Sequence, residues 1–329
     1  MAAGRVSDRK APPDKPGGEE AWPVVVSLHG GGLKAGSWRD GGPTVFGLFR
    51  KHFDRLILVA PNVLQQNYAE WGGNPLEEVY VRELLKAVKR TWKIDTNRVF
   101  LAGFSMGGYG TWHMGGHQAD LFAGLFSGAG GLLIGASLRH AWGWGTIANL
   151  MHTPIAFLHG GQDRDSPPWS DEEASKILSA LAAEHPGSYR TKYLFYPQAG
   201  HGVPGEGSEQ AAAWLSQFAR SPHPRKVLWE PKRAHIQQFY WLRLDKPDIF
   251  LRLYAEIEGN TVRIKTENVF GGLTVLLNRH LLDLAKPVRV EIDGRPAFEG
   301  VIQPTLSAIL ETVESRIDER QWFPARISF

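Results

Sequence analysis

The residues with the clearest chemical signature form the sequence GFSMG at positions 103–107, which matches the pattern G-x-S-x-G. An apolar run, Arg98–Ala102, ends just before it, and a helical pattern begins just after it. A sharp turn from strand to helix holds its serine in a strained backbone conformation, and flanking glycines leave room for the chain to double back. This context favours Ser105 as a nucleophile at a helix N-terminus, where a developing oxyanion is stabilised, over an idle serine in a tight turn.

A serine hydroxyl is a weak nucleophile at its ordinary pKa and needs an adjacent base. The sequence AGHG at 199–202 places His201 in a glycine-flanked loop after the apolar run Lys192–Tyr196. Histidine suits the role because its ordinary pKa lies near neutral pH. Alone, such a residue would be interpreted as a solvated loop histidine, but its position after the last predicted strand favours His201 as the general base.

The acid that orients this histidine is expected after the preceding strand. There, an apolar run leads into the sequence HGGQDRDSP at 159–167, which contains Asp163 and Asp165. A carboxylate at this place can accept the Nδ1 proton of histidine and stabilise the imidazolium. We favour Asp163, because Asp165 lies closer to the solvated prolines. The order Ser105, Asp163, His201 is that of α/β-hydrolases and differs from the orders of chymotrypsin-like and subtilisin-like proteases.

A second backbone donor for the oxyanion is predicted from the sequence HGGG at 29–32, directly after the apolar run 22–28. Turns of this type occur in lipases and esterases, where the glycines let the backbone approach the substrate carbonyl. The predicted donors are the amides of Gly31 and of Met106, the residue after the nucleophile. The competing interpretation is a flexible turn that merely follows a strand.

Apolar runs alternate with helical patterns from residue 22 to about residue 218, and residues 1–21 have the composition of a disordered tail. Near-continuous apolar strands connected through helices form a parallel sheet that helices cover on both faces. The predicted fold class is therefore α/β, a doubly wound and mainly parallel sheet, and the predicted catalytic domain is 22–220. The predicted strands lie at 22–28, 55–60, 98–102, 121–126, 154–158 and 192–196.

The pattern changes at the sequence SPHPR, residues 221–225, where two prolines mark a linker. Beyond it, short runs with alternating apolar residues are separated by turn signals such as DG at 293–294. These signals predict a smaller, sandwich-like antiparallel β module at 226–329. A short helix near 307–315 and a last strand near 326–329 would close it.

Four sequences together resemble one superfamily: LHGGG at 28–32, GFSMGGYGTW at 103–112, HGGQDRD at 159–165 and AGHG at 199–202. They resemble α/β-hydrolase carboxylesterases, and within them the polyhydroxybutyrate-depolymerase-like and feruloyl or acetylxylan esterases, over residues 22–219. The resemblance implies an active site at the carboxyl ends of the strands and no metal or organic cofactor. The chain has no cysteine, whereas many relatives that act outside the cell carry disulfides, which argues against a secreted, polymer-degrading role.

Three tryptophans are candidates for binding substrate because they fall in insertions after predicted strands. Trp71 lies in the insertion 61–75, and Trp142 and Trp144 lie in the insertion 130–151. Loops at the carboxyl ends of strands line sites in such sheets, and indoles there could hold an aromatic or sugar-like group. The alternative is that these rings belong to the core.

Several classes of partner are disfavoured. The formal net charge is only +3 and the basic residues are scattered, which argues against nucleic acid. The pair His113 and His117 has a spacing that could bind a metal, but no acidic partner is obvious, so packing is favoured. No apolar run approaches the roughly 18 residues that span a membrane. The N-terminus lacks the apolar region of a signal peptide, so the sequence as written is expected in the cytoplasm, with secretion open if a signal has been removed.

The leading functional prediction is hydrolysis of a carboxylic ester, free or linked to a polymer, through an acyl-serine intermediate. A serine peptidase of the prolyl-oligopeptidase type would use the same triad in the same order. Such peptidases normally carry a large propeller before the hydrolase domain, and a short tail stands there in this sequence. A non-catalytic binding or scaffolding protein, with the antiparallel module as its binding part, is a further alternative. Nothing in the sequence indicates the oligomeric state.

Overall fold

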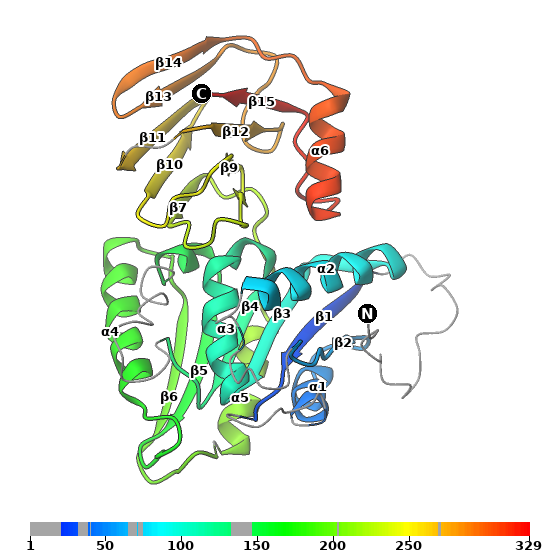
Figure 1. Ribbon diagram of the computed structural model, residues 1–329, viewed down its shortest axis with the longest axis vertical. Helices are drawn as coiled ribbons and strands as arrows, with labels where there is room; N and C mark the ends of the chain where they lie inside the picture. The colour runs from blue at the N-terminus through cyan, green and yellow to red at the C-terminus, as the bar shows by residue number, and fades with distance from the viewer. Residues whose placement is uncertain are drawn as a thin grey trace. The chain divides into compact units, whose positions relative to one another are not determined.

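The computed structural model describes residues 21–31, 39, 41–64, 71, 75–132, 147–202, 204–268 and 271–329. The chain divides into two compact units, the first ending at Arg220 and the second comprising Ser221–Phe329 (Figure 1). Within the described residues, helices that combine the length and the apolar character needed to cross a membrane are absent.

The first unit is built on a six-stranded sheet with the strand order β2-β1-β3-β4-β5-β6. Every neighbouring pair in it is parallel, so the prediction of a doubly wound parallel sheet is confirmed. The strands are β1 (Trp22–Leu28), β2 (Ile57–Val59), β3 (Ile94–Phe104), β4 (Gly124–Gly128), β5 (Ile155–Gly160) and β6 (Thr191–Tyr196).

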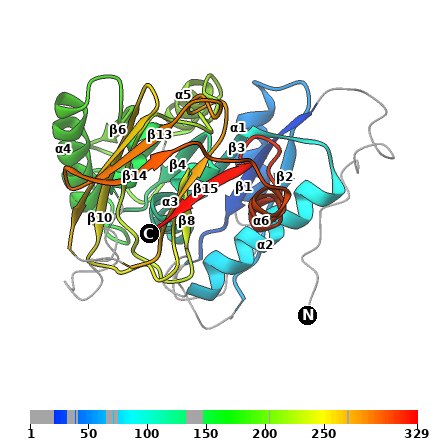
Figure 2. The same ribbon diagram turned by 90° about the horizontal axis from the view of Figure 1, so that it is seen from above.

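Helices cover both faces of this sheet (Figure 2). Helices α1 and α5 pack against each other and against one face, whereas α3 packs against β1, β3 and β4 on the other. Both faces are apolar because successive residues of a strand point to opposite sides and nearly all of them here are apolar. The helices are α1 (Gly42–Arg50), α2 (Pro75–Thr91), α3 (Met106–His117), α4 (Trp169–Glu184) and α5 (Gly205–Leu215).

The fourth strand begins later than the sequence pattern predicts. A single turn of 3₁₀-helix, Ala119–Leu121, follows α3, and β4 then begins at Gly124. The Thr153 hydroxyl donates to the Ala119 carbonyl at 2.8 Å, so a polar contact holds this turn outside the sheet. Leu121 and Phe122 are therefore apolar because they belong to a packed connection between α3 and β4. The strand predicted at 121–126 is found at 124–128.

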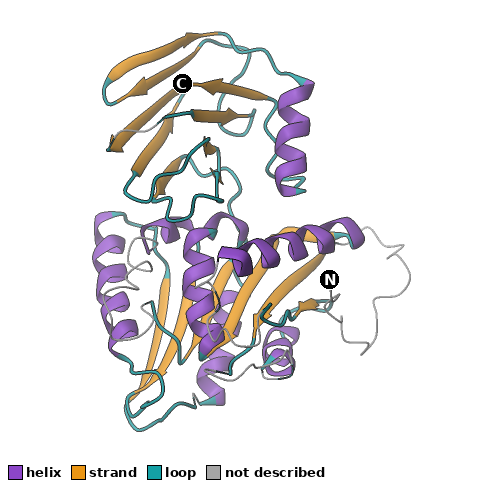
Figure 3. Ribbon diagram, viewed as in Figure 1, coloured by secondary structure: helices purple, strands orange, loops and turns teal. Residues whose placement is uncertain are grey.

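The second unit consists of two small sheets and a helix (Figure 3). One has the order β14-β13-β11-β10-β7, and the other has the order β15-β12-β9-β8. The indole of Trp229 on β7 stacks on the ring of Phe239 on β8 with centroids 5.9 Å apart, which joins the two sheets in one core. The elements are β7 (Lys226–Trp229), β8 (Gln238–Phe239), β9 (Leu242–Leu244), β10 (Arg252–Glu258), β11 (Thr261–Glu267), β12 (Leu273–Leu277), β13 (Val288–Ile292), β14 (Arg295–Gly300), α6 (Leu306–Arg316) and β15 (Ala325–Ser328).

Two details of the second unit correct the sequence analysis. Strand β13 runs parallel to β11, so the module is mixed rather than wholly antiparallel. Residues 221–225, interpreted as a linker, hydrogen-bond within this unit: the Trp241 indole donates to the Pro224 carbonyl at 2.7 Å. The predicted hairpin at Asp293 and Gly294 is confirmed, with both residues at positive φ between β13 and β14. The predicted last helix and last strand are also present, as α6 and β15.

Candidate active site

Ser105 occupies the turn between β3 and α3, with φ 57° and ψ −121°. A non-glycine residue at positive φ is strained and persists only where its surroundings enforce it. Here the glycines two positions away on either side permit it, because they leave room for backbone segments to approach closely. A Cβ on Gly103 would lie 2.1 Å from the Gly107 carbonyl oxygen, and a Cβ on Gly107 would lie 2.0 Å from the Leu28 carbonyl oxygen. The Ser105 N–H donates to the Gly128 carbonyl at 2.8 Å, which fixes the turn against β4.

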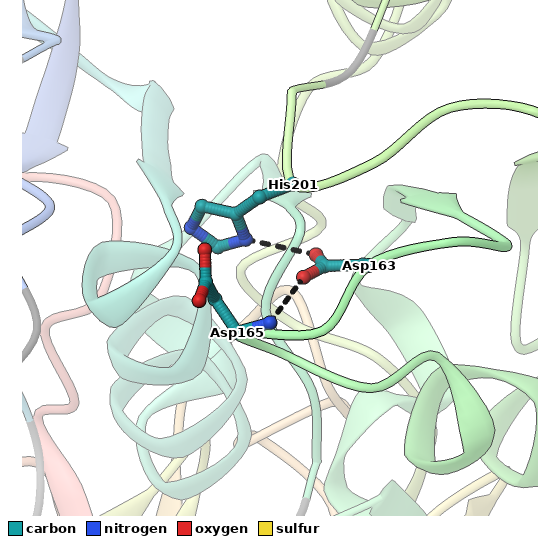
Figure 4. Close-up of side chains that lie close together, drawn as sticks. All are labelled: Asp163, Asp165 and His201. Carbon is teal, nitrogen blue, oxygen red and sulfur yellow. Dashed lines mark hydrogen bonds and ion pairs between the residues drawn. The ribbon is translucent and has the colours of Figure 1, made fainter.

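Three predicted side chains meet at the carboxyl ends of β3, β5 and β6. The Oγ of Ser105 lies 2.9 Å from Nε2 of His201. The Nδ1 of His201 lies 2.8 Å from Oδ2 of Asp163, the contact drawn in Figure 4. The histidine side chain is 29% exposed, whereas the aspartate side chain is fully buried. The group can therefore exchange a proton with a substrate at its serine end while its acid end stays away from water.

The two candidate acids have different surroundings. Oδ1 of Asp163 accepts the backbone N–H groups of Ser166 at 2.8 Å and Asp165 at 3.0 Å. Asp165 is exposed, and its own carboxylate lies beside the His201 ring without a hydrogen bond drawn to it (Figure 4). The structure thus brings Asp163 into hydrogen-bond contact with His201 and leaves Asp165 as a nearby surface charge.

Asp163, Asp165 and His201 also have donor atoms within 4.8 Å of one another, close enough to share a metal ion. Two of the three are engaged in the hydrogen bond between His201 and Asp163, and His201 is engaged with Ser105 as well. Ser105, His201 and Asp163 are thus linked in series as a nucleophile, a base and an acid, with one hydrogen bond between each neighbouring pair. We therefore interpret it as a proton-transfer group.

The predicted oxyanion donors lie on two segments that approach each other. A Cβ on Gly30 would lie 3.3 Å from the Phe104 carbonyl oxygen and 3.7 Å from the Ser105 Cβ, so the HGGG turn passes beside the nucleophile. Gly31 has φ 137°, which side chains rarely adopt. Met106 is the first residue of α3, where backbone N–H groups lack partners within the helix. The last glycine of the turn lies outside the described residues.

Trp71 has a different place from the one predicted. Its side chain is fully buried, its indole N–H donates to the His29 carbonyl at 2.9 Å, and its ring meets the His29 ring edge-on at 5.1 Å. The ring is thus enclosed by the protein and contacts the HGGG turn through His29, which is the core alternative left open in the sequence analysis. Trp142 and Trp144 lie outside the described residues.

A buried network behind the triad was missed in the sequence. His159, on β5, places Nδ1 at 2.7 Å from Oδ2 of Asp171 and Nε2 at 2.5 Å from the Ser166 carbonyl. The other oxygen of Asp171 accepts the Trp112 indole N–H at 3.0 Å. The signal available was a histidine four residues before the triad acid, at the end of a fully apolar strand, followed by an aspartate in the first turn of the next helix.

Charges in this network shift the pKa values of both titrating partners. Burial alone would lower the pKa of His159, but hydrogen bonds to Asp171 and Ser166 and the negative charges of Asp171 and Asp163 outweigh it and raise that pKa. Burial raises the pKa of the Asp171 carboxyl, against the opposing effects of His159 and Trp112. The two groups together therefore retain a proton to higher pH than separate groups in water would.

A second buried pair corrects the analysis of the paired histidines on α3. His117 has an acidic partner after all: its Nδ1 lies 2.9 Å from Oε1 of Glu78 on α2, and both side chains are almost completely buried. The rings of His113 and His117 lie 6.3 Å apart, edge to face. The contact ties α2 to α3 within the fold.

Known proteins similar to parts of the chain were found in two of three comparisons. Protein-family models were scanned, and none matches the chain. A protein of Salmonella typhimurium named putative carboxymethylenebutenolidase is 29% identical over 136 residues, which are 38% of this chain and 48% of the relative. A protein of Escherichia coli with the same name is 33% identical over 107 residues, 32% of this chain and 37% of the relative. The chain thus spans less than half the length of these curated relatives.

Among solved structures, a thermostable esterase is similar over 64% of this chain and 57% of that chain, with 24% sequence identity and a TM-score of 0.45. In its motifs and in the topology of its first unit, the chain resembles serine esterases of the α/β-hydrolase superfamily.

Proposed function

We propose that this chain is a serine hydrolase that cleaves carboxylic esters through an acyl-serine intermediate. The observation that carries the proposal is the continuous hydrogen-bonded series from Ser105 through His201 to the buried carboxylate of Asp163. This series lies at the carboxyl ends of parallel strands, and Ser105 occupies a strained turn before a helix. Open α/β sheets bind their ligands at this edge. The curated relatives, named for cleavage of a butenolide, add support for ester chemistry.

In the proposed reaction, Nε2 of His201 accepts the proton of Ser105 while the serine oxygen attacks the ester carbonyl carbon. Asp163 holds the imidazole in the required tautomer and balances the charge of the imidazolium. His201 then donates the proton to the departing alcohol, which leaves the acyl group on Ser105. A water molecule then attacks the acyl carbon while His201 accepts its proton. His201 returns this proton to Ser105 as the carboxylic acid leaves.

Stabilisation of the tetrahedral oxyanion is assigned to the backbone amides of Gly31 and Met106. Support comes from the close approach of the HGGG turn to Ser105 and from the position of Met106 at the start of α3. Backbone donors fixed before the reaction need no reorganisation as charge develops, and loss of one such donor typically lowers kcat about 10²–10³-fold. The neighbouring glycines have no side chain between these amides and a substrate.

The substrate class can be tested with a panel of p-nitrophenyl esters, feruloyl esters, acetylated sugars, a butenolide lactone and peptide anilides. We expect turnover of one or more esters and a loss of at least about 10⁴-fold in Ser105→Ala. Ser179→Ala is the matched control, because Ser179 is an exposed serine of α4 that bonds only to its own helix. Turnover restricted to the peptide anilides would indicate a peptidase of the prolyl-oligopeptidase type. If none of the substrates is turned over in a way that depends on Ser105, the proposal is refuted.

A further inference from the structure

A second histidine lies next to the acid of the proposed triad. Nε2 of His159 is 3.4 Å from Oδ2 of Asp163, the same oxygen that contacts His201 at 2.8 Å. The His159 side chain is completely buried, and so is the Asp163 side chain. A fully buried carboxylate needs compensation for its lost hydration, through hydrogen bonds or a nearby opposite charge. His159 is placed to supply the charge.

The protonation of His159 follows from the groups that face its two ring nitrogens. Nε2 lies 2.5 Å from the Ser166 carbonyl, which can only accept, so Nε2 carries a hydrogen. Nδ1 lies 2.7 Å from Oδ2 of Asp171, so one proton is held between these two atoms. The histidine and Asp171 together therefore carry either an imidazolium and a carboxylate or two neutral groups.

Two contacts favour the charged form of this pair. The Trp112 indole N–H donates to the second oxygen of Asp171 at 3.0 Å, which stabilises a carboxylate there. On the other side of the ring, the negative charge of Asp163 stabilises an imidazolium. Burial raises the pKa of Asp171 and so opposes the charged form, but these attractions also raise the pKa of His159 in spite of its burial, and with the two contacts they favour the ion pair. The resulting order of charges is negative at Asp171, positive at His159 and negative at Asp163.

Other titratable groups around this pair leave the order of charges intact near neutral pH. Tyr193 of β6 has its pKa raised by burial and by the negative charges of Asp171 and Glu172, so its phenol stays neutral. Glu172 of α4 is exposed, as is Asp165 in the loop after β5, and solvent screens both charges. Among the described residues, the Tyr109 hydroxyl lies 2.6 Å from the Ser166 Oγ, and His201 shares the Oδ2 atom of Asp163 with His159.

We propose that His159 is a cationic positioning residue: paired with Asp171, it holds Asp163 and the turn to Ser166 in place and limits the basicity of His201. The inference rests on the proposed triad. Without the positive charge, Asp163 would stabilise the His201 imidazolium more strongly, and the base would be blocked by a proton at higher pH. With it, part of the attraction of Asp163 is directed to His159 rather than to the base.

The test is nitrogen NMR of protein carrying ¹⁵N-labelled histidine, with the His159 signals identified by their loss in His159→Gln. At pH 7 the wild type is expected to show both ring nitrogens of His159 protonated. In Asp171→Asn the His159 ring is expected to become neutral, and the titration midpoint of His201 is expected to rise by roughly half to one pH unit. The acidic limb of kcat/KM should move by the same amount in the same direction. A purely structural role would lower activity without moving either midpoint.

Glu172→Gln is the matched control, because it removes one negative charge from the same helical turn at an exposed position. A neutral His159 in the wild type, or a His201 midpoint in Asp171→Asn equal to that in Glu172→Gln, would overturn the inference. If Asp171→Asn does not fold, the protonation of His159 in the wild type decides the charge on its own. The spectra require no turnover, so a failure of this inference is distinct from a failure of the proposed ester hydrolysis.

Discussion

Asp163 and Asp165 stand two positions apart but differ in what surrounds their carboxylates. Asp163 is buried and accepts hydrogen bonds from His201 and from two backbone N–H groups, whereas Asp165 is exposed. A carboxylate with this environment can hold the histidine in one tautomer throughout the reaction. The role of acid therefore belongs, in this account, to the aspartate that the fold removes from water.

Replacement of the two aspartates separates their roles. We expect Asp163→Asn to lower kcat by about 10³–10⁴-fold, because the amide favours the wrong histidine tautomer and cannot balance the imidazolium. Asp165→Asn serves as the control and should change kcat by less than about tenfold, since it removes an exposed and screened charge. Steady-state kinetics on p-nitrophenyl acetate measures both. The opposite ranking of the two variants would assign the acid to Asp165.

Single residues of the candidate site could be predicted from the sequence where their role requires a local pattern of neighbouring residues. Ser105 and His201 each lie beside glycines just after an apolar strand, so their meeting could be predicted from strand ends alone. The burial of Trp71 could not be predicted, because nothing in a loop sequence tells whether an indole points outward or inward. His159 was missed for a related reason: its role depends on Asp171, which packing of α4 brings to it.

At the scale of elements, the turn from β3 to α3 depends on how closely three segments approach. Gly107 lies so near the end of β1 that a Cβ would overlap the Leu28 carbonyl, and Gly103 lies equally near Gly107. Backbone atoms of a central strand cannot move away without disturbing the sheet. The G-x-S-x-G pattern is thus explained by contacts that only glycine permits.

Gly107→Ala tests this explanation. We expect a loss of more than about 3 kcal/mol in the free energy of unfolding, together with loss of ester turnover, because the added methyl group meets backbone on a buried strand. Gly47→Ala is the control: Gly47 also lies in a helix, but apart from its own helix turn nothing lies within 4 Å of its Cβ position, so stability should rise by up to about 1 kcal/mol. Urea unfolding followed by tryptophan fluorescence measures both. Equal stabilities for the two variants would contradict the contact argument.

Strand and helix positions in the first unit were largely predictable, because parallel strands buried on both faces are continuous apolar runs. The 3₁₀ turn at 119–121 was not, since an apolar connection has the same composition as a short strand. In the second unit, the hairpin at 293–294 followed from its turn residues, but the parallel pairing of β11 with β13 did not. Pairing between strands that a tight turn does not connect is decided by the packed fold rather than by local sequence.

At the scale of the whole molecule, the second unit has a core of its own. Trp229, Phe239 and Trp241 are buried within it, and the indole of Trp241 hydrogen-bonds to Pro224 in the segment that precedes β7. The ring of Trp229 also stacks on that of Phe239 within the unit. A boundary at Ser221, rather than at the predicted 226, keeps these contacts intact.

A fragment of residues 221–329 is expected to fold without the rest of the chain and to unfold in a single cooperative transition. A fragment that begins at residue 226 is the matched comparison, because it lacks the Pro224 carbonyl that accepts from Trp241. An unsatisfied buried donor costs about 1–3 kcal/mol, so the shorter fragment should be less stable by that amount. Thermal unfolding monitored by circular dichroism measures both. Two fragments of equal stability would show that 221–225 is a linker after all.

The central claim, that Ser105 is the activated nucleophile of the molecule, is tested most directly by a fluorophosphonate probe, which bonds covalently to activated serines. We expect one adduct per chain in the intact mass of the wild type, located at Ser105 by peptide mapping. No adduct is expected in Ser105→Ala, and unchanged labelling is expected in the control Ser179→Ala. Labelling of Ser105→Ala at the wild-type rate, or an adduct at another residue of the wild type, would contradict it.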